Sequence, residues 1–224
     1  MLWGFSKSKG METVILILEL IGTVAFSMSG ALLGIRKNLD IFGILVMGVT
    51  TSVGGGFIRD ITIGTVPPVM FSNPIYCVTA LLTAAMMCIP CIRRLLSGRL
   101  AYNVFMIGMD SVGLAVFTVM GVIYTYKYYP DKSFLMIFTG VVCGIGGGVL
   151  RDILAGELPY ILRKHIYACA AIAGAVCAAF MLKYFGSVRA AVLSGVPLII
   201  LIRAVAAYFR INLPHINDNN ETEQ

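Results

Sequence analysis

Long apolar segments separated by short polar stretches occupy most of this chain, between residues 13 and 209. An α-helix needs about 20 predominantly apolar residues to cross a membrane. Seven segments approach or exceed that length: Thr13–Leu33, Ile41–Gly64, Ile75–Ile92, Asn103–Tyr126, Phe134–Gly156, Ile166–Tyr184 and Val188–Phe209. The polar stretches between them are short, so the helices have to pack as a tight bundle. The pattern predicts an all-α integral membrane protein with seven transmembrane helices.

The composition supports this fold class. Hydrophobic residues make up 58% of the chain and charged residues 12%, whereas a soluble domain carries about 25% charged residues. The mean hydropathy is +0.90. The net charge of +6 is spread over helix ends and loops, which is typical of lysines and arginines at membrane interfaces. Nucleic acid is therefore not expected as a partner.

One sequence motif occurs twice with the same internal spacing, in the second and in the fifth apolar segment. Its first copy comprises Gly54, Gly55, Gly56, Arg59 and Asp60, and its second comprises Gly146, Gly147, Gly148, Arg151 and Asp152. The copies lie 92 residues apart. Each is followed by a further glycine, Gly64 or Gly156, with a proline three residues on, which is a helix-stop pattern. The repetition indicates that the chain arose by duplication of a helical unit.

The similarity between the two halves extends beyond this motif. Glu19, Gly22, Phe26, Gly30 and Asp40 match Asp110, Gly113, Phe117, Gly121 and Asp131 at an offset of 91. We therefore expect one three-helix repeat over residues 13–100 and a second over residues 101–185. Because three is an odd number, the second repeat enters the membrane from the opposite face, which makes the repeats inverted. A seventh helix (186–210) lies outside the symmetry, residues 1–12 form an N-terminal segment, and the polar tail (211–224) is expected to be disordered.

The glycine triplets are the predicted centre of each repeat. Each glycine disfavours a helix by about 1 kcal/mol relative to alanine. We therefore expect the second and fifth helices to be broken there and to expose backbone carbonyls to a hydrophilic cavity, where irregular backbone is tolerated inside a membrane. Carbonyl oxygens suit hard cations. The alternative is that the glycines only allow a neighbouring helix to pack closely.

The charged residues beside the glycines have two interpretations. Charges inside apolar helices usually face the interior of the bundle and mark pathways. Arg59 and Asp60 are adjacent, as are Arg151 and Asp152, so the members of each pair point to different sides of a helix. Partners on other helices are therefore expected rather than a local ion pair. The alternative role of each arginine is to tie a loop to a neighbouring helix.

Further polar positions lie in the first, fourth and last segments. Glu19 and Asp110 form a second matched acidic pair, which we interpret as counter-charges for the arginines or as cation sites. For Asp110 the alternative is that its side chain snorkels to a membrane interface, and Arg203 is also expected to snorkel. Tyr124 lies among other tyrosines and is interpreted as part of an interfacial aromatic belt.

The lysines and arginines of the loops bear on orientation. Six lie on the side of the N-terminus and eight on the opposite side. This asymmetry favours an N-terminus outside and a cytoplasmic C-terminus, with the protein in the inner membrane of the cell.

The doubled motif, the seven segments and the plan of two three-helix repeats plus one helix resemble the trimeric intracellular cation (TRIC) channel family, in its prokaryotic branch. The resemblance covers residues 13–209. It implies a homotrimer among membrane lipids, in which each protomer holds its own pore for potassium and, less selectively, sodium. It also implies that the second and fifth helices bend at the glycine triplets and line that pore. Animal members bind phosphoinositide through a basic motif that we do not find here.

Two functions fit these features. The first is a passive channel for monovalent cations. The second is a secondary transporter for a small amino acid such as glycine, whose carboxylate would meet the positive N-terminus of a broken helix; some bacterial relatives are described as glycine transporters. An enzyme is not expected, because no nucleophile–base set, metal cluster or phosphate loop is visible. No cofactor is expected.

Overall fold

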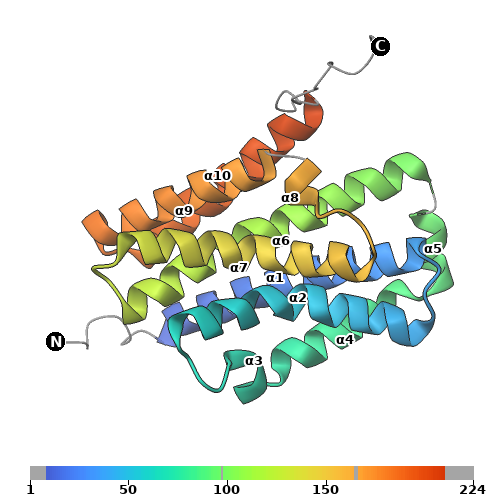
Figure 1. The fold of residues 1–224 in the computed structure, drawn as a ribbon, viewed down its shortest axis with the longest axis horizontal. Helices are drawn as coiled ribbons and strands as arrows, with labels where there is room; N and C mark the ends of the chain where they lie inside the picture. Colours follow the sequence, from blue (N-terminus) through green and yellow to red (C-terminus); the bar gives the residue numbers. More distant parts are fainter. Residues whose placement is uncertain (1–8, 97, 164–165, 210–224) are drawn as a thin grey trace, which may run out of the picture.

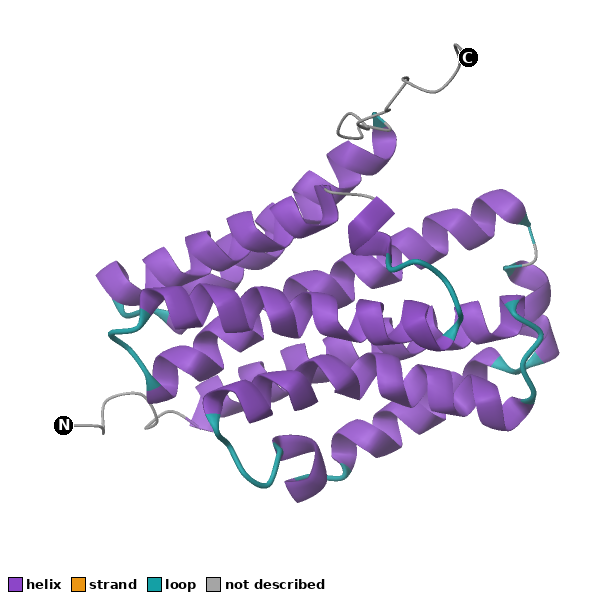
Figure 2. Cartoon of the chain, in the orientation of Figure 1, coloured by secondary structure: helices purple, strands orange, loops and turns teal. Residues whose placement is uncertain are grey.

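The computed structural model describes residues 9–96, 98–163 and 166–209, which form a bundle of helices (Figure 1). Within these ranges the chain consists of helices and connecting loops, without a strand (Figure 2). The expected disordered tail lies outside the described residues, as do the first eight residues of the N-terminal segment.

Six of the helices are long and apolar enough to cross a membrane. They are α1 (Lys9–Arg36), α2 (Ile41–Ile63), α6 (Arg99–Tyr128), α7 (Ser133–Leu154), α9 (Ile166–Phe185) and α10 (Val188–Tyr208). The shorter helices are α3 (Val69–Ser72), α4 (Ile75–Met87), α5 (Pro90–Leu95) and α8 (Tyr160–Arg163). The structure therefore agrees with a multi-pass, all-helical membrane protein.

The third predicted span differs from the prediction. Instead of one helix over Ile75–Ile92, the chain forms α4, which has 13 residues, and then the separate helix α5, which starts at Pro90. Proline has no backbone N–H to donate and its ring clashes with the carbonyl four residues earlier, so a helix does not continue through it. At about 1.5 Å per residue, α4 alone spans about 20 Å, less than the apolar thickness of a membrane.

Local signals fix both ends of α2. The side chain of Asp40 accepts a hydrogen bond of 2.7 Å from the backbone N–H of Gly43, which caps the N-terminus. At the other end Gly64 has a left-handed φ of 76°, which glycine adopts without steric cost. Gly156 follows α7 with a φ of 67°. The predicted helix stops at these two glycines are confirmed.

Helices α1, α2, α6 and α7 form the centre of the bundle. Helix α2 packs against α1 and α7, and α6 also packs against α1 and α7. Helix α4 packs on α1 and α2, whereas α9 packs on α6 and α7, so each half contributes one outer helix in the corresponding place. Helix α10 packs on α9 and α6 and lies on one side of the bundle (Figure 1). In this arrangement α1, α2 and α4 lie in places that correspond to those of α6, α7 and α9, whereas α10 lies outside that correspondence.

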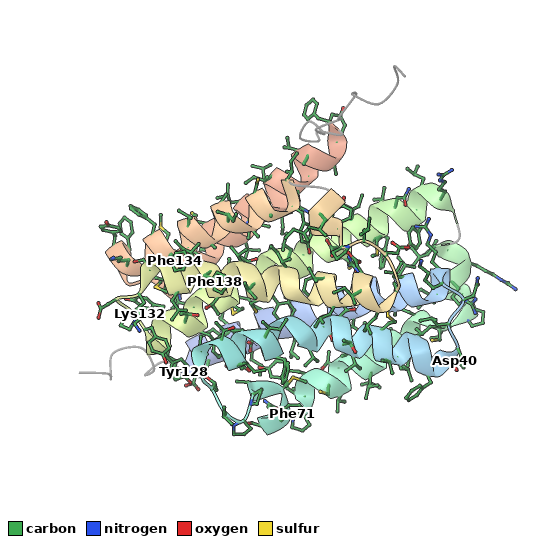
Figure 3. All side chains as sticks on the ribbon, viewed as in Figure 1. Asp40, Phe71, Tyr128, Lys132, Phe134 and Phe138 are labelled. Atoms are coloured by element: carbon green, nitrogen blue, oxygen red, sulfur yellow. The ribbon has the colours of Figure 1, made fainter. Side chains whose placement is uncertain are left out.

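Large apolar side chains are exposed on the outer helices of the bundle. Phe134 and Phe138 lie on the outer side of α7 (Figure 3), and their side chains are 81% and 48% exposed. Tyr128 and Lys132 lie at one end of the long axis, and Asp40 lies at the other (Figure 3). Polar and aromatic residues at the ends with apolar side chains between them are typical of a protein whose long axis crosses the membrane.

The central helices also meet in pairs that respect the predicted repeat. A Cβ added to Gly22 of α1 would press on Phe117 of α6, and one added to Gly113 of α6 would press on Phe26 of α1. The rings of Phe26 and Phe117 stack with their centroids 5.3 Å apart. Helices α1 and α6 run in opposite directions (Figure 1). Reciprocal contacts between antiparallel helices are what an inverted repeat requires.

Candidate functional site

The glycine triplets lie where α2 crosses α7. Both helices continue through the triplets without interruption, so the predicted breaks are wrong. A Cβ at Gly55 would collide with the backbone carbonyl of Cys143, and a Cβ at Gly147 would collide with that of Thr51. Close approach of the two backbones therefore requires glycine. The packing that follows offsets the low helix propensity of about 1 kcal/mol for each glycine.

A first buried charge cluster lies beside this crossing and consists of Glu19, Arg59, Asp60, Tyr76 and Tyr124. The Arg59 Nε donates to Asp60 Oδ1 at 2.8 Å, and its Nη1 lies 3.3 Å from Glu19 Oε1. The guanidinium carbon of Arg59 also lies 3.9 Å from the ring centroid of Tyr124. The charged side chains are buried, so the arginine is held on one side by its own helix and on the other by α1.

Two tyrosine hydroxyls donate hydrogen bonds to the second carboxylate oxygen of Glu19. The Tyr76 hydroxyl donates to Oε2 at 2.6 Å, and the Tyr124 hydroxyl donates to the same atom at 3.3 Å. Asp60 Oδ2 accepts a hydrogen bond of 2.8 Å from the backbone N–H of Val69, which starts α3. The cluster thus joins α1, α2, α4 and α6 and fixes the loop that follows α2.

A second buried cluster occupies the corresponding place in the other half and contains Asp110, Arg151, Asp152 and Arg203. The Arg151 Nε lies 2.9 Å from Asp152 Oδ1, and its Nη1 lies 2.7 Å from Asp110 Oδ1. Nη1 also donates to the hydroxyl of Ser29. Asp152 Oδ2 accepts a hydrogen bond of 2.7 Å from the backbone N–H of Tyr160 at the start of α8.

Arg203 enters the second cluster from α10, outside the repeated helices. Its Nη2 lies 3.3 Å from Asp110 Oδ2, and its Nε donates to Ser111 Oγ at 3.0 Å. Its guanidinium carbon lies 4.7 Å from the ring centroid of Tyr167. Asp110 and Arg203 are 3% and 5% exposed, so the alternative that Asp110 snorkels to an interface and the expectation that Arg203 does so are both wrong. Each residue has its counter-charge inside the bundle, which removes the reason to reach water.

Other predictions about these side chains also need correction. Adjacent Arg59 and Asp60 do form a local ion pair, and so do Arg151 and Asp152. The long arginine side chain folds back so that its guanidinium reaches the neighbouring carboxylate, in addition to the acid on another helix. Tyr124 belongs to the first cluster instead of an interfacial belt, because its hydroxyl reaches Glu19.

Sequence reasoning missed Tyr76, Tyr167 and the structural role of Arg203. Tyr76 and Tyr167 lie 91 residues apart, which is the offset that relates Glu19 to Asp110. That spacing was a usable signal. Arg203 had a signal as well, because an arginine deep inside an apolar stretch of a helix calls for a buried acid.

Two cavities adjoin the first cluster. The larger has a volume of about 220 Å³ and is lined by Glu19, Tyr76 and Tyr124, with Glu12 and Lys127 also in its wall. The smaller has a volume of about 30 Å³ and extends along Arg59, Asp60 and Gly56. Glu19 and Tyr76 line both cavities, so this pair lies at their boundary. The second cluster lines neither of the two.

Comparison with known proteins gives consistent matches over most of the chain. Residues 16–90 and 107–183 match a family described as "Glycine transporter". A UPF0126 membrane protein from Deinococcus radiodurans is 38% identical over 199 residues, which cover 88% of this chain and 89% of the relative.

Two solved structures match at a similar level. The TRIC trimeric intracellular cation channel orthologue from Rhodobacter sphaeroides is 32% identical, with a TM-score of 0.80 over 89% of this chain and 100% of that one. A TRIC cation channel studied for the structural basis of its conductance is 29% identical, with a TM-score of 0.78 over 90% of this chain and 96% of that one.

Proposed function

Since this chain belongs to the prokaryotic branch of the TRIC family, we propose that it is a channel for monovalent cations, potassium and also sodium, with a pore within each protomer of a homotrimer. The observation that carries the proposal is the likeness over nine-tenths of the chain to solved cation channels. The buried first cluster supports it, because a carboxylate beside a cavity attracts cations into the bundle.

The pore is proposed to follow the first cluster and the α2–α7 crossing. Side chains would guide the ion in place of carbonyls from broken helices, because α2 and α7 are continuous at the glycines. Arg59 and Arg151 would not repel cations strongly, since each lies against two carboxylates. The tight contact at Gly55 and Gly147 would have to loosen for an ion to pass, which places the gate at the crossing.

A carrier for a small amino acid such as glycine is the second candidate, and the description of the matching family favours it. That mechanism was expected to use the N-terminus of a broken helix to bind the substrate carboxylate. The continuity of α2 and α7 leaves no such N-terminus at the glycine triplets. The structure therefore supports the channel more than the carrier.

We also propose the inner membrane as the location, with the N-terminus outside. In that orientation the larger cavity, whose wall includes Lys127 near the end of α6, faces the outside. Lipid would cover the exposed apolar side chains that do not contact the other protomers.

Recording from the purified full-length protein in planar bilayers tests the function. A channel gives ohmic potassium current without added substrate, and replacing potassium by N-methyl-D-glucamine abolishes the current. Silent bilayers together with saturable glycine uptake into liposomes made from the same preparation would establish the carrier instead.

A further inference from the structure

We propose that Glu19 Oε2, beside the hydroxyl oxygens of Tyr76 and Tyr124, is a binding site for a monovalent cation, and that the second half lacks such a site because Arg203 occupies the equivalent place. The inference rests on the proposed cation conduction. It goes further by naming where an ion binds and by making the two halves of the pseudo-symmetric bundle functionally different.

The two clusters correspond atom by atom around the motif arginines. Arg59 Nη1 approaches Glu19 Oε1 at 3.3 Å, as Arg151 Nη1 approaches Asp110 Oδ1 at 2.7 Å. In each cluster the arginine contacts one carboxylate oxygen, so the other oxygen, Glu19 Oε2 or Asp110 Oδ2, can bind a different group. The two halves can therefore be compared by the group that contacts this other oxygen.

In the second half, this second carboxylate oxygen pairs with a positively charged side chain of the protein. The guanidinium of Arg203 lies 3.3 Å from Asp110 Oδ2 and packs near the ring of Tyr167. A positive group between a carboxylate and an aromatic face is a favourable arrangement. Tyr167 is the counterpart of Tyr76 at the 91-residue offset. The second half thus shows that a positively charged group fits between the second carboxylate oxygen and the tyrosine ring.

In the first half, the hydrogen-bond donors to the equivalent oxygen among the described residues are the neutral hydroxyl groups of Tyr76 and Tyr124. The first cluster has two carboxylates and one guanidinium, whereas the second has two of each. The first cluster consequently holds one more negative than positive charge in a buried place. Burial of an uncompensated charge is costly, so a mobile cation stabilises this cluster.

The cavities give an ion access to this oxygen. The cavity of about 220 Å³ reaches Glu19, Tyr76 and Tyr124, and a water molecule takes up about 30 Å³ in the liquid. The space therefore holds an ion with several waters. Glu12 and Lys127 line the same cavity, and both are exposed. Their opposite charges offset each other, so they do not supply the positive charge that Arg203 supplies in the second cluster.

The oxygen atoms suit potassium or sodium. A carboxylate oxygen, two phenol oxygens with free lone pairs and cavity water form an all-oxygen set, which hard cations prefer. The single excess charge matches a monovalent ion better than a divalent one. Permeation also needs binding that is weak enough for release, and one carboxylate with neutral co-ligands meets that requirement.

A binding measurement tests the site without relying on current. The thermal unfolding midpoint of the full-length protein in detergent is measured against potassium chloride, with N-methyl-D-glucamine chloride keeping the ionic strength constant. The wild-type midpoint should rise by several degrees and saturate. Glu19→Gln should lose this rise. Asp131→Asn removes an exposed carboxylate in the loop before α7 and should keep it.

Two further variants keep the test decisive if Glu19→Gln does not fold. Glu19→Asp retains the charge but retreats from the tyrosine hydroxyls, so half-saturation should need several-fold more potassium. Arg203→Gln frees Asp110 Oδ2 and should enlarge the potassium-dependent rise.

Potassium dependence in Glu19→Gln or Glu19→Asp equal to that of the wild type overturns the site. A wild-type channel that conducts but shows no potassium-specific rise overturns the site and leaves the channel standing. A rise that depends on Glu19 in a protein without current overturns the channel and leaves the site standing.

Discussion

The two buried clusters are built from matching residues but are completed by different groups. In the first, Glu19 is held by Arg59 and by two tyrosine hydroxyls. In the second, Asp110 is held by Arg151 and by Arg203 from the helix outside the repeats. The matching acids lie in corresponding places, and Arg203 of α10 adds a second positive charge to the second cluster. The comparison teaches that the unrepeated helix can make two halves of one fold chemically different.

The difference predicts unequal costs when the two acids are neutralised. Asp110→Asn leaves two arginines against one carboxylate in a buried place, and should lower the free energy of unfolding by about 3–5 kcal/mol. Glu19→Gln leaves Arg59 paired with Asp60 and should cost clearly less. Unfolding by sodium dodecyl sulfate titration measures both. Adding Arg203→Gln to Asp110→Asn should recover part of the loss, and equal costs for the two single variants would contradict the account.

The glycine crossing should instead respond symmetrically. Gly55→Ala and Gly147→Ala each place a Cβ against a backbone carbonyl of the other helix, and each should cost about 1–3 kcal/mol. Gly56→Ala is the matched control, because its Cβ would meet only the end of Arg59, at 3.9 Å. The same titration should show Gly56→Ala near the wild type. A cost for Gly56→Ala as large as for Gly55→Ala would mean that the close approach is not the reason for these glycines.

The smallest expected effect separates the two corresponding tyrosines. Tyr76→Phe removes a 2.6 Å hydrogen bond to a carboxylate and should cost about 1.5 kcal/mol. Tyr167→Phe should be nearly neutral, because its buried hydroxyl has no hydrogen-bond partner among the described residues. Thermal unfolding in detergent resolves this difference. Equal shifts of the unfolding midpoint in the two variants would contradict the proposed difference between the clusters.

The sequence predicted six of the seven spans, because transmembrane length and hydropathy are strong constraints, whereas the third predicted span divides at Pro90. It predicted the helix stops at Gly64 and Gly156 because the glycine and proline signals are local. It failed at the glycine triplets, where contacts between α2 and α7 override the low helix propensity. Propensity describes a segment alone, and only the folded bundle supplies the neighbour that makes glycine necessary.

The candidate site was predicted in part. Glu19 and Asp110 were chosen from the repeat, and the structure places each beside a motif arginine. The comparison of the two repeats did not identify Arg203, because this residue has no counterpart in the other half. The residue that distinguishes the two clusters therefore lay outside the pattern used to find them. Once the acidic residues inside the bundle are known, a buried arginine can be expected to pair with one of them.

Single-channel potassium conductance of two charge variants tests the central claim most directly. Glu19→Gln removes the unneutralised carboxylate, whereas the double variant Asp110→Asn with Arg203→Gln removes a neutral pair. At low potassium the account predicts that Glu19→Gln loses most of the wild-type conductance and that the double variant keeps it. Retained conductance in Glu19→Gln with loss in the double variant would contradict the account.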